Sequence, residues 1–230
     1  MVFKKHLNFF IGNCSQKFIL SRIIPIINIL FYGLLMFSSL FFPQDFNIIK
    51  NNISNLGNPI LNQFPGTLLF TFAFLVISIA LPFVYIYIYR RLVKFFKYTA
   101  IPGLIFFFMA SVGLFMLSLF PNVGNFVNIH LFSGIFSFAC FVTGLIFFWV
   151  VILKNIIVKK SWHWPISISA ISIFIGSLLF IVIELGLIQS GIHSSNPWFL
   201  GFSFLEWILL FNITIQTGIF ILIIPKNIPT

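Results

Sequence analysis

The sequence predicts an all-α, polytopic integral membrane protein: six transmembrane helices in one bundle, with both termini in the cytoplasm. Composition is the first observation behind this prediction. Of 230 residues, 60% are hydrophobic and 7% are charged, and the mean hydropathy is +1.12. Soluble domains are about 25% charged, so 13 basic and 3 acidic residues are too few to cover a soluble surface. The other two observations are the spacing of the apolar stretches and the placement of the basic residues.

Apolar stretches of membrane length recur six times along the chain. A hydrocarbon core about 30 Å thick needs about 20 apolar residues in a helix. The predicted spans are 23–42, 67–89, 98–120, 131–153, 165–187 and 199–224. The flanking parts are a cytoplasmic, partly interfacial segment and a cytoplasmic tail, which gives the division 1–22, 23–224 and 225–230. Because no linker or soluble domain interrupts the spans, one compact bundle is expected.

The basic residues predict the orientation. All but one of the 13 lie before span one, between spans two and three, between spans four and five, or after span six. The exception is Lys50. Cytoplasmic loops carry the excess of Lys and Arg, so both termini are predicted to be cytoplasmic. The basic clusters suit anionic lipid headgroups. Nucleic acid is not an expected partner, because no folded domain presents these clusters.

Individual spans carry packing signals. Pro82 and Pro102 are expected to bend or delimit spans two and three. In span four, the small residues Ser133 and Ser137 are four apart, a spacing that permits close helix contact in lipid. Span six has the most polar faces, and it includes Asn212 and Gln216 as an i, i+4 pair.

The first outer loop, 43–66, contains the densest polar stretch of the chain, NNISNLGNP. Asn and Gly tolerate left-handed backbone, and Pro59 favours a turn. Asn52 also begins a glycosylation sequon on the predicted outer side. The loop is expected to cap the outer mouth of the bundle, either as a structural plug or as the frame of a ligand site.

The acidic residues gather at the same predicted level. Asp45 lies in the outer loop, Glu184 near the outer end of span five, and Glu206 about two turns into span six. A charged side chain at mid-span costs about 2.5–3.5 kcal/mol. Glu206 is therefore expected to face the bundle interior, a polar cavity or a partner. His130, which opens span four, and the Asn-rich loop are the expected partners.

Several segments resemble the six-helix membrane proteins grouped as domain of unknown function 998, which occur in archaea and bacteria. The segments are NNISNLGNP, PGTLLFTFAF, LPFVYIYIYRRL and LFPNVGNFVNIHLFSGIFSF. Within the last, Phe120, Pro121 and His130 match the group's Phe-Pro before a His. The resemblance covers about 30–220, and Asn55 departs from it, because relatives often have an acid there. The group is distantly similar to Frag1/DRAM/Sfk1-type proteins, so the resemblance implies lipid handling.

The expected function is non-enzymatic lipid interaction in the cell membrane, through a polar site on the outer face. The candidate ligand-binding residues share that level, and they are Asn51, Ser54, Asn55, Asn58, His130, Glu184 and Glu206. Membrane lipids are the expected partners, and a homo-oligomer or a membrane protein partner stays open. The sequence predicts no catalytic residue, no metal ligand and no cofactor.

Three alternatives remain open for the same cluster. It can be a set of structural hydrogen bonds that holds the bundle together. It can serve a small transporter or proton-coupled carrier that uses Glu206. It can also belong to an intramembrane metal-dependent hydrolase, although only His130 and His193 lie on the outer side. No HExxH, GxSxG or Walker pattern is present.

Overall fold

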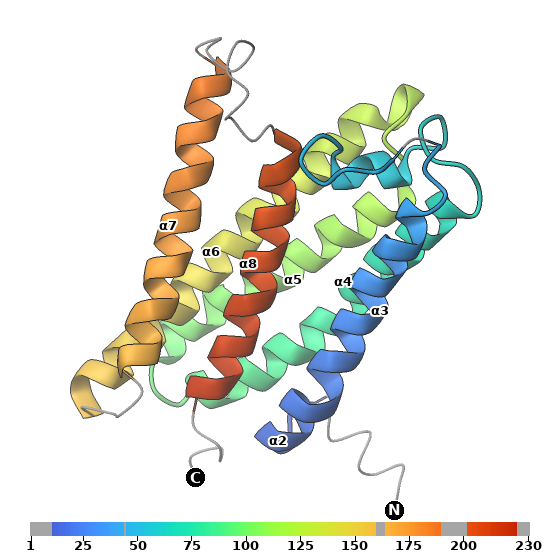
Figure 1. Cartoon of the computed structure of the whole chain (residues 1–230). Helices are drawn as coiled ribbons and strands as arrows, with labels where there is room; N and C mark the ends of the chain where they lie inside the picture. Colours follow the sequence, from blue (N-terminus) through green and yellow to red (C-terminus); the bar gives the residue numbers. More distant parts are fainter. Residues whose placement is uncertain (1–10, 44, 160–163, 190–201, 225–230) are drawn as a thin grey trace, which may run out of the picture.

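The computed structural model describes residues 11–43, 45–159, 164–189 and 202–224, which form helices, turns and short loops (Figure 1). The first helix runs without a break through α2 (Gln16–Phe18), a π-helical turn η1 (Ile19–Ile23) and α3 (Ile24–Ser39). The remaining long helices are α4 (Gly66–Leu92), α5 (Lys97–Leu119), α6 (Val127–Lys159), α7 (Trp164–Gln189) and α8 (Phe202–Ile223). Two short 3-10 helices are η2 (Ile53–Gly57) and η3 (Gly124–Phe126).

Within the described ranges, five helices are long and apolar enough to cross a membrane. They are Gln16–Ser39, Gly66–Leu92, Lys97–Leu119, Gly124–Asn155 and Glu206–Ile223. In α7, the described apolar run is the shorter Pro165–Gly176. The first helix begins inside the predicted interfacial segment rather than after it. Helix α6 extends beyond both limits of the predicted span 131–153, and the ends of α4, α5, α7 and α8 lie within about three residues of the predicted limits. Pro82 and Pro102 lie within α4 and α5, so neither proline ends its helix.

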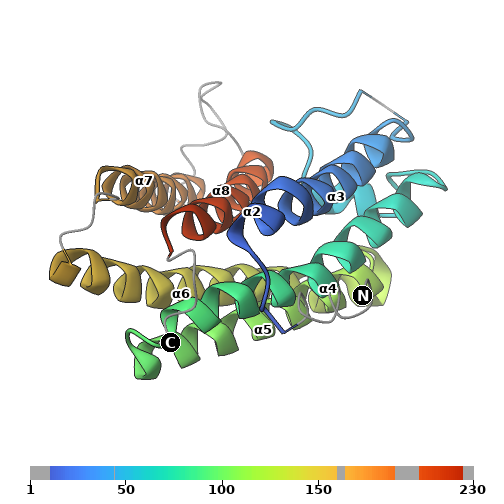
Figure 2. The same cartoon turned by 90° about the horizontal axis from the view of Figure 1, so that it is seen from below.

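The long helices are arranged in two layers. Seen from below, α7, α8 and α3 form one layer, and α6, α5 and α4 form the other (Figure 2). The start of α2 and the end of α8 lie at one end of the bundle (Figure 1). The loop before α4 and the turn between α5 and α6 lie at the opposite end. We call this second end the loop end.

Helices α5 and α6 pack closely against each other through small residues. A Cβ atom added to Gly113 would lie 2.8 Å from the Ser137 Cβ and 3.0 Å from the Ser133 carbonyl oxygen. The Ser137 hydroxyl donates to the Ala110 carbonyl at 2.7 Å. Small residues therefore let the two backbones approach closely, which confirms the role predicted for Ser133 and Ser137.

Polar side chains of α8 join the two layers. The predicted pair is confirmed: Gln216 Nε2 lies 3.4 Å from Asn212 Oδ1. Gln216 also donates to the Ala170 carbonyl on α7 at 2.9 Å and accepts from Trp149 Nε1 on α6 at 3.1 Å. Two hydroxyl pairs, each 2.8 Å apart, join α8 to α4 and α3: Tyr85 with Thr217, and Tyr32 with Thr214.

Candidate functional site

The loop that precedes α4, residues 45–65, folds over the loop end of the bundle. We call it the capping loop. Its centre is η2, which begins after the extended residue Asn52 and buries Ile53 and Leu56. Asn52 makes no side-chain hydrogen bond to the first turn of η2, although Asn is a favoured capping residue. The free backbone N–H groups of that turn therefore need another acceptor.

Glu206 of α8 supplies this acceptor. Its Oε2 accepts a hydrogen bond from the Ile53 backbone N–H at 2.9 Å, and the carboxylate also accepts one from the backbone of Ser54. An acidic group is favourable at the start of a helix, because the free N–H groups there carry partial positive charge. Glu206 thus caps η2 from a different helix, and its carboxylate is bound to the capping loop.

Ser203, one turn before Glu206, makes a second attachment. Its hydroxyl donates to the Lys50 carbonyl at 3.1 Å and also lies in hydrogen-bond contact with the Asn52 side-chain oxygen. Residues 50–54 are therefore bound by Ser203 and by Glu206, which lie on successive turns at the start of α8. This attachment was not predicted, because Ser203 carries no distinguishing sequence signal within an apolar helix.

A third attachment joins the capping loop to α3 and α4. Asn62 is 1% exposed, and its Nδ2 donates to the Leu56 carbonyl at 2.8 Å and to the Ser38 hydroxyl at 3.0 Å. Ser38 in turn donates to the Gly66 carbonyl at 2.7 Å. A Cβ atom at Gly66 would lie 2.5 Å from Asn62 Oδ1, so only glycine fits there without a shift. The polar Asn62 shortly before an apolar span was the available sequence signal.

The predicted loop residues all lie on this cap. Asn51 Oδ1 accepts from the Asn47 backbone N–H at 2.9 Å. Asn58 donates to the Asn122 carbonyl in the α5–α6 turn at 2.6 Å. Ser54 and Asn55 are half-buried on η2. The four residues therefore share one loop. Ser54 contacts Glu206 through its backbone, and the side chains of Asn51 and Asn58 hold the loop by other bonds.

His130 and the other acids occupy separate places. His130 is 4% exposed, and its Nδ1 lies 2.7 Å from the Phe120 carbonyl oxygen at the end of α5. In the described part of the chain, no hydrogen bond joins His130 to Glu206. Asp45 is exposed on the capping loop. Glu184 lies in α7, its side chain is outside the described residues, and His193 is also outside them.

The opposite end of the bundle carries most of the described basic residues, and we call it the basic end; Lys50 lies on the capping loop instead. Those at the basic end include Lys17, Arg22, Arg90, Arg91, Lys94, Lys97 and Lys154. Arg91 is 2% exposed and lies 3.6 Å from the centre of the Tyr87 ring. It donates to the Tyr87 carbonyl at 3.0 Å and to the Cys14 carbonyl at 2.9 Å.

Residues 11–16 cross the basic end as a strap between α4 and α8. Gly12 adopts a φ of +69° and packs against the Tyr87 backbone, where a Cβ atom would approach to 3.0 Å. At the other side of the strap, Gln16 Nε2 donates to carbonyl groups of Ile221 and Leu222. The strap was not predicted, because the basic residues were interpreted as topology signals and as contacts to lipid headgroups, not as groups that bind the backbone of the chain.

The two cysteines are free thiols at different depths. Cys14 is half-buried in the strap, and Cys140 is buried in α6. Burial raises the pKa of the Cys14 thiol, and the nearby positive charge of Arg91 opposes this rise in pKa. Among the described residues, no group of three His, Cys, Asp or Glu side chains is placed to hold a metal ion.

These observations define an all-helical protein with five helices of membrane-spanning length, a polar cap at one end and a basic cluster at the other. Comparison of the chain with family models, curated proteins and solved structures finds no match. The functional argument therefore depends on the geometry of these two ends.

Proposed function

We propose that this chain is a multi-pass protein of the cell membrane that binds lipid, without catalysis, through the capping loop on the outer face. In this proposal α7 is the sixth span, and both termini are cytoplasmic. The membrane-length helices support insertion. The gathering of basic residues at one end supports the orientation, because Lys and Arg are retained on the cytoplasmic side. The resemblance to domain of unknown function 998 proteins points the same way.

The observation that carries the proposal is the amphipathic surface of the capping loop. Ile60 and Phe64 are 75% and 79% exposed, and Leu61 is 40% exposed. The half-buried amide and hydroxyl groups of Ser54 and Asn55 lie on the same loop. Apolar side chains gain about 25 cal/mol for each Å² removed from water. A surface that combines these two kinds of side chain suits the boundary between lipid headgroups and acyl chains.

The attachments to the bundle make this surface rigid before a ligand arrives. Glu206, Ser203 and Asn62 hold the loop at three points. A loop that is already ordered loses less conformational entropy on binding. The amides and hydroxyls on its surface then offer hydrogen bonds to a headgroup, and Ile60 and Phe64 enter the acyl layer.

One crevice inside the bundle is too small to hold an acyl chain. An apolar crevice between α3, α4, α6 and α8 has a free volume of about 20 Å³, enough for about one water molecule. Its lining includes Ile27, Ile77, Phe138 and Ile213. An acyl chain does not fit in this volume without helix movement. A carrier that uses Glu206 is less favoured, because that carboxylate already binds the loop backbone.

Native mass spectrometry of gently extracted protein tests the proposal. The wild type is compared with the double variant Ile60→Ser/Phe64→Ser on the loop. A matched control, Phe132→Ser/Ile135→Ser, removes similarly exposed apolar side chains from α6. We expect the wild type and the control to retain a defined lipid and the loop variant to lose it. Equal retention by both variants, or no lipid on the wild type, would overturn the proposal.

A further inference from the structure

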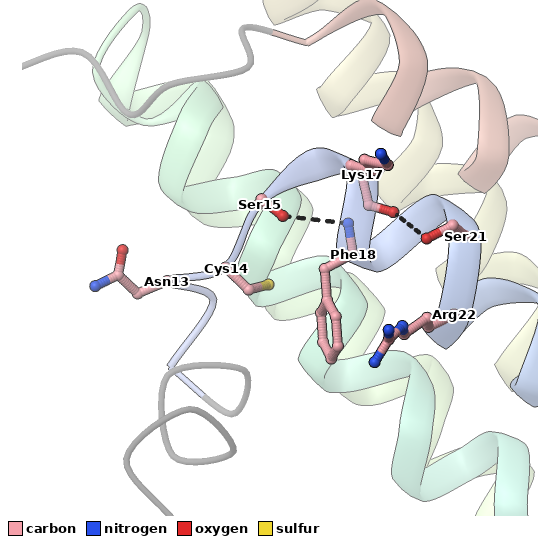
Figure 3. A pocket seen from close by; sticks show the side chains of 7 residues that line it. All are labelled: Asn13, Cys14, Ser15, Lys17, Phe18, Ser21 and Arg22. Atoms are coloured by element: carbon pink, nitrogen blue, oxygen red, sulfur yellow. Dashed lines mark hydrogen bonds between the residues drawn. The ribbon is translucent and has the colours of Figure 1, made fainter. Parts of the chain in front are cut away.

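The basic end contains a hollow that the capping-loop proposal does not use. Its volume is about 440 Å³, and it lies beside the first helical turns of the chain (Figure 3). The lining comprises Asn13–Ser15, Lys17, Phe18, Ser21 and Arg22. This volume falls in the range of about 300–1,000 Å³ that is usual for small-molecule sites. Two basic residues, two serines and one phenylalanine are therefore among the residues that line one hollow.

The charge in this hollow is uncompensated among the described residues. Lys17 and Arg22 are exposed, and neither has an acidic or hydrogen-bonding partner there. The Arg22 guanidinium lies 6.0 Å from the Phe18 ring centre, at the outer limit of a cation–π contact, so it can turn to an anion. The described carboxylates, Asp45 and Glu206, belong to the loop end. An anionic ligand would meet no acidic neighbour.

The backbone around the hollow is held in place. The Phe18 N–H donates to the Ser15 hydroxyl at 3.2 Å, and the Ser21 hydroxyl donates to the Lys17 carbonyl at 2.7 Å (Figure 3). The buried Arg91 fixes the strap by its bond to the Cys14 carbonyl. The π-helical turn η1 includes Ser21 and Arg22, and π-helical turns occur frequently at functional sites. The hollow is thus built from ordered backbone.

An apolar track leads away from the hollow along the first helix. Phe18, Arg22, Ile26 and Ile29 follow one another at spacings of four, four and three, which places them near one face of the helix. Ile26 is 53% exposed and Ile29 is 70% exposed. A ligand that fits both parts has an anionic head and long apolar chains.

We propose that this hollow binds the phosphate group of an anionic phospholipid, with its acyl chains along α3. Lys17 and Arg22 pair with the phosphate oxygens, the Ser15 hydroxyl donates to the same group, and Phe18 packs on the glycerol region. The site is separate from the capping loop and does not depend on that proposal. The shared chemistry is a phosphate anion, and we commit to a lipid rather than free phosphate because of the apolar track.

The test measures lipid affinity by native mass spectrometry of the full chain in neutral detergent. The probes are phosphatidylglycerol and phosphatidylcholine with identical acyl chains. The variant Lys17→Gln/Arg22→Gln removes the two hollow charges. The matched control Lys97→Gln/Lys154→Gln removes two exposed charges at the same end of the bundle, outside the hollow. We expect phosphatidylglycerol to bind the wild type and the control preferentially, and the hollow variant to lose affinity for it by about tenfold or more.

Three outcomes would overturn the proposal. Equal loss in both variants would show general electrostatic attraction to the protein. Equal binding of the two lipids by the wild type would show no headgroup selectivity. Displacement of phosphatidylglycerol by excess inorganic phosphate would make a free anion the occupant. Two controls separate loss of binding from loss of folding. The variant Arg22→Lys keeps the charge and should retain its affinity for phosphatidylglycerol. The melting temperature of the hollow variant should equal that of the wild type.

Discussion

At the residue scale, Glu206 shows how a carboxylate can lie at the loop end of an apolar helix without a cation. Burying a charged group is costly unless it is hydrogen-bonded. The backbone N–H groups of Ile53 and Ser54 provide this compensation. The carboxylate gains hydrogen-bond donors, and the free N–H groups at the start of η2 gain an acceptor. The main role of Glu206 is therefore to position the capping loop.

The variant Glu206→Ala should loosen the capping loop and reduce stability by about 1–3 kcal/mol, because it leaves buried N–H donors without an acceptor. Hydrogen exchange should rise at residues 53–57, and the melting temperature in detergent should fall. The variant Glu206→Gln keeps an acceptor oxygen and should lose less. If Glu206→Gln unfolds as easily as Glu206→Ala, the capping account is wrong and the charge itself is required.

Cys14 provides a pH-dependent prediction at the same scale. Burial favours the neutral thiol and raises the pKa of Cys14, whereas alkylation requires the thiolate. In a Cys140→Ser background, the rate of iodoacetamide alkylation should therefore reach its half-maximum at a higher pH in the folded protein than in the denatured chain. By the same linkage, stability should fall as the pH rises through the raised pKa. Identical midpoints would contradict a buried thiol.

At the element scale, the α5–α6 pair is the most tightly packed contact. The nearest atoms to a Cβ at Gly113 belong to Ser137 and to the Ser133 backbone, and backbone atoms cannot rotate away. The tight pair anchors one layer of the bundle. The other layer is tied to it by hydrogen bonds from α8, of which those of Gln216 reach both α6 and α7.

The variant Gly113→Ala should destabilise the protein by about 1–3 kcal/mol, because the added methyl group forces α5 and α6 apart. The matched control is Gly33→Ala on α3, where no atom lies within 4 Å of the added Cβ. Since alanine favours helix more than glycine does, the control should be neutral or slightly stabilising. Unfolding monitored by circular dichroism in detergent compares the two. Equal melting temperatures would show that the contact is not tight.

At the scale of the whole molecule, the sequence predicted the features that depend on amino-acid composition and on the periodic spacing of residues along a helix. The apolar lengths predicted the helices, and the spacing of Asn212 and Gln216 predicted their contact, because both are local properties. The Asn-rich loop was predicted as a partner of Glu206, and this is confirmed, but the particular groups that Glu206, His130 and Arg91 bind could not be predicted. Each of these side chains binds backbone atoms, which every residue carries, so residue identities do not reveal the pairing. Arg91 illustrates this, since a residue expected to mark topology is buried under the strap.

The two ends of the molecule differ in a way that both proposals require. The capping loop must face outward to meet one leaflet, and the basic end must face the cytoplasm. Impermeant cysteine labelling of intact cells measures this directly in a background of Cys14→Ser and Cys140→Ala. The reporters are Asp45→Cys on the capping loop, away from the apolar side chains proposed to enter the lipid, and Tyr98→Cys on α5 at the basic end; both replace exposed side chains.

We predict that the Asp45→Cys variant is labelled in intact cells and that the Tyr98→Cys variant is labelled only after the cells are permeabilised. Labelling of Tyr98→Cys alone in intact cells would reverse the orientation. It would then contradict the outer lipid site at the capping loop. Labelling of both variants in intact cells would contradict a bundle that spans the membrane between these two positions.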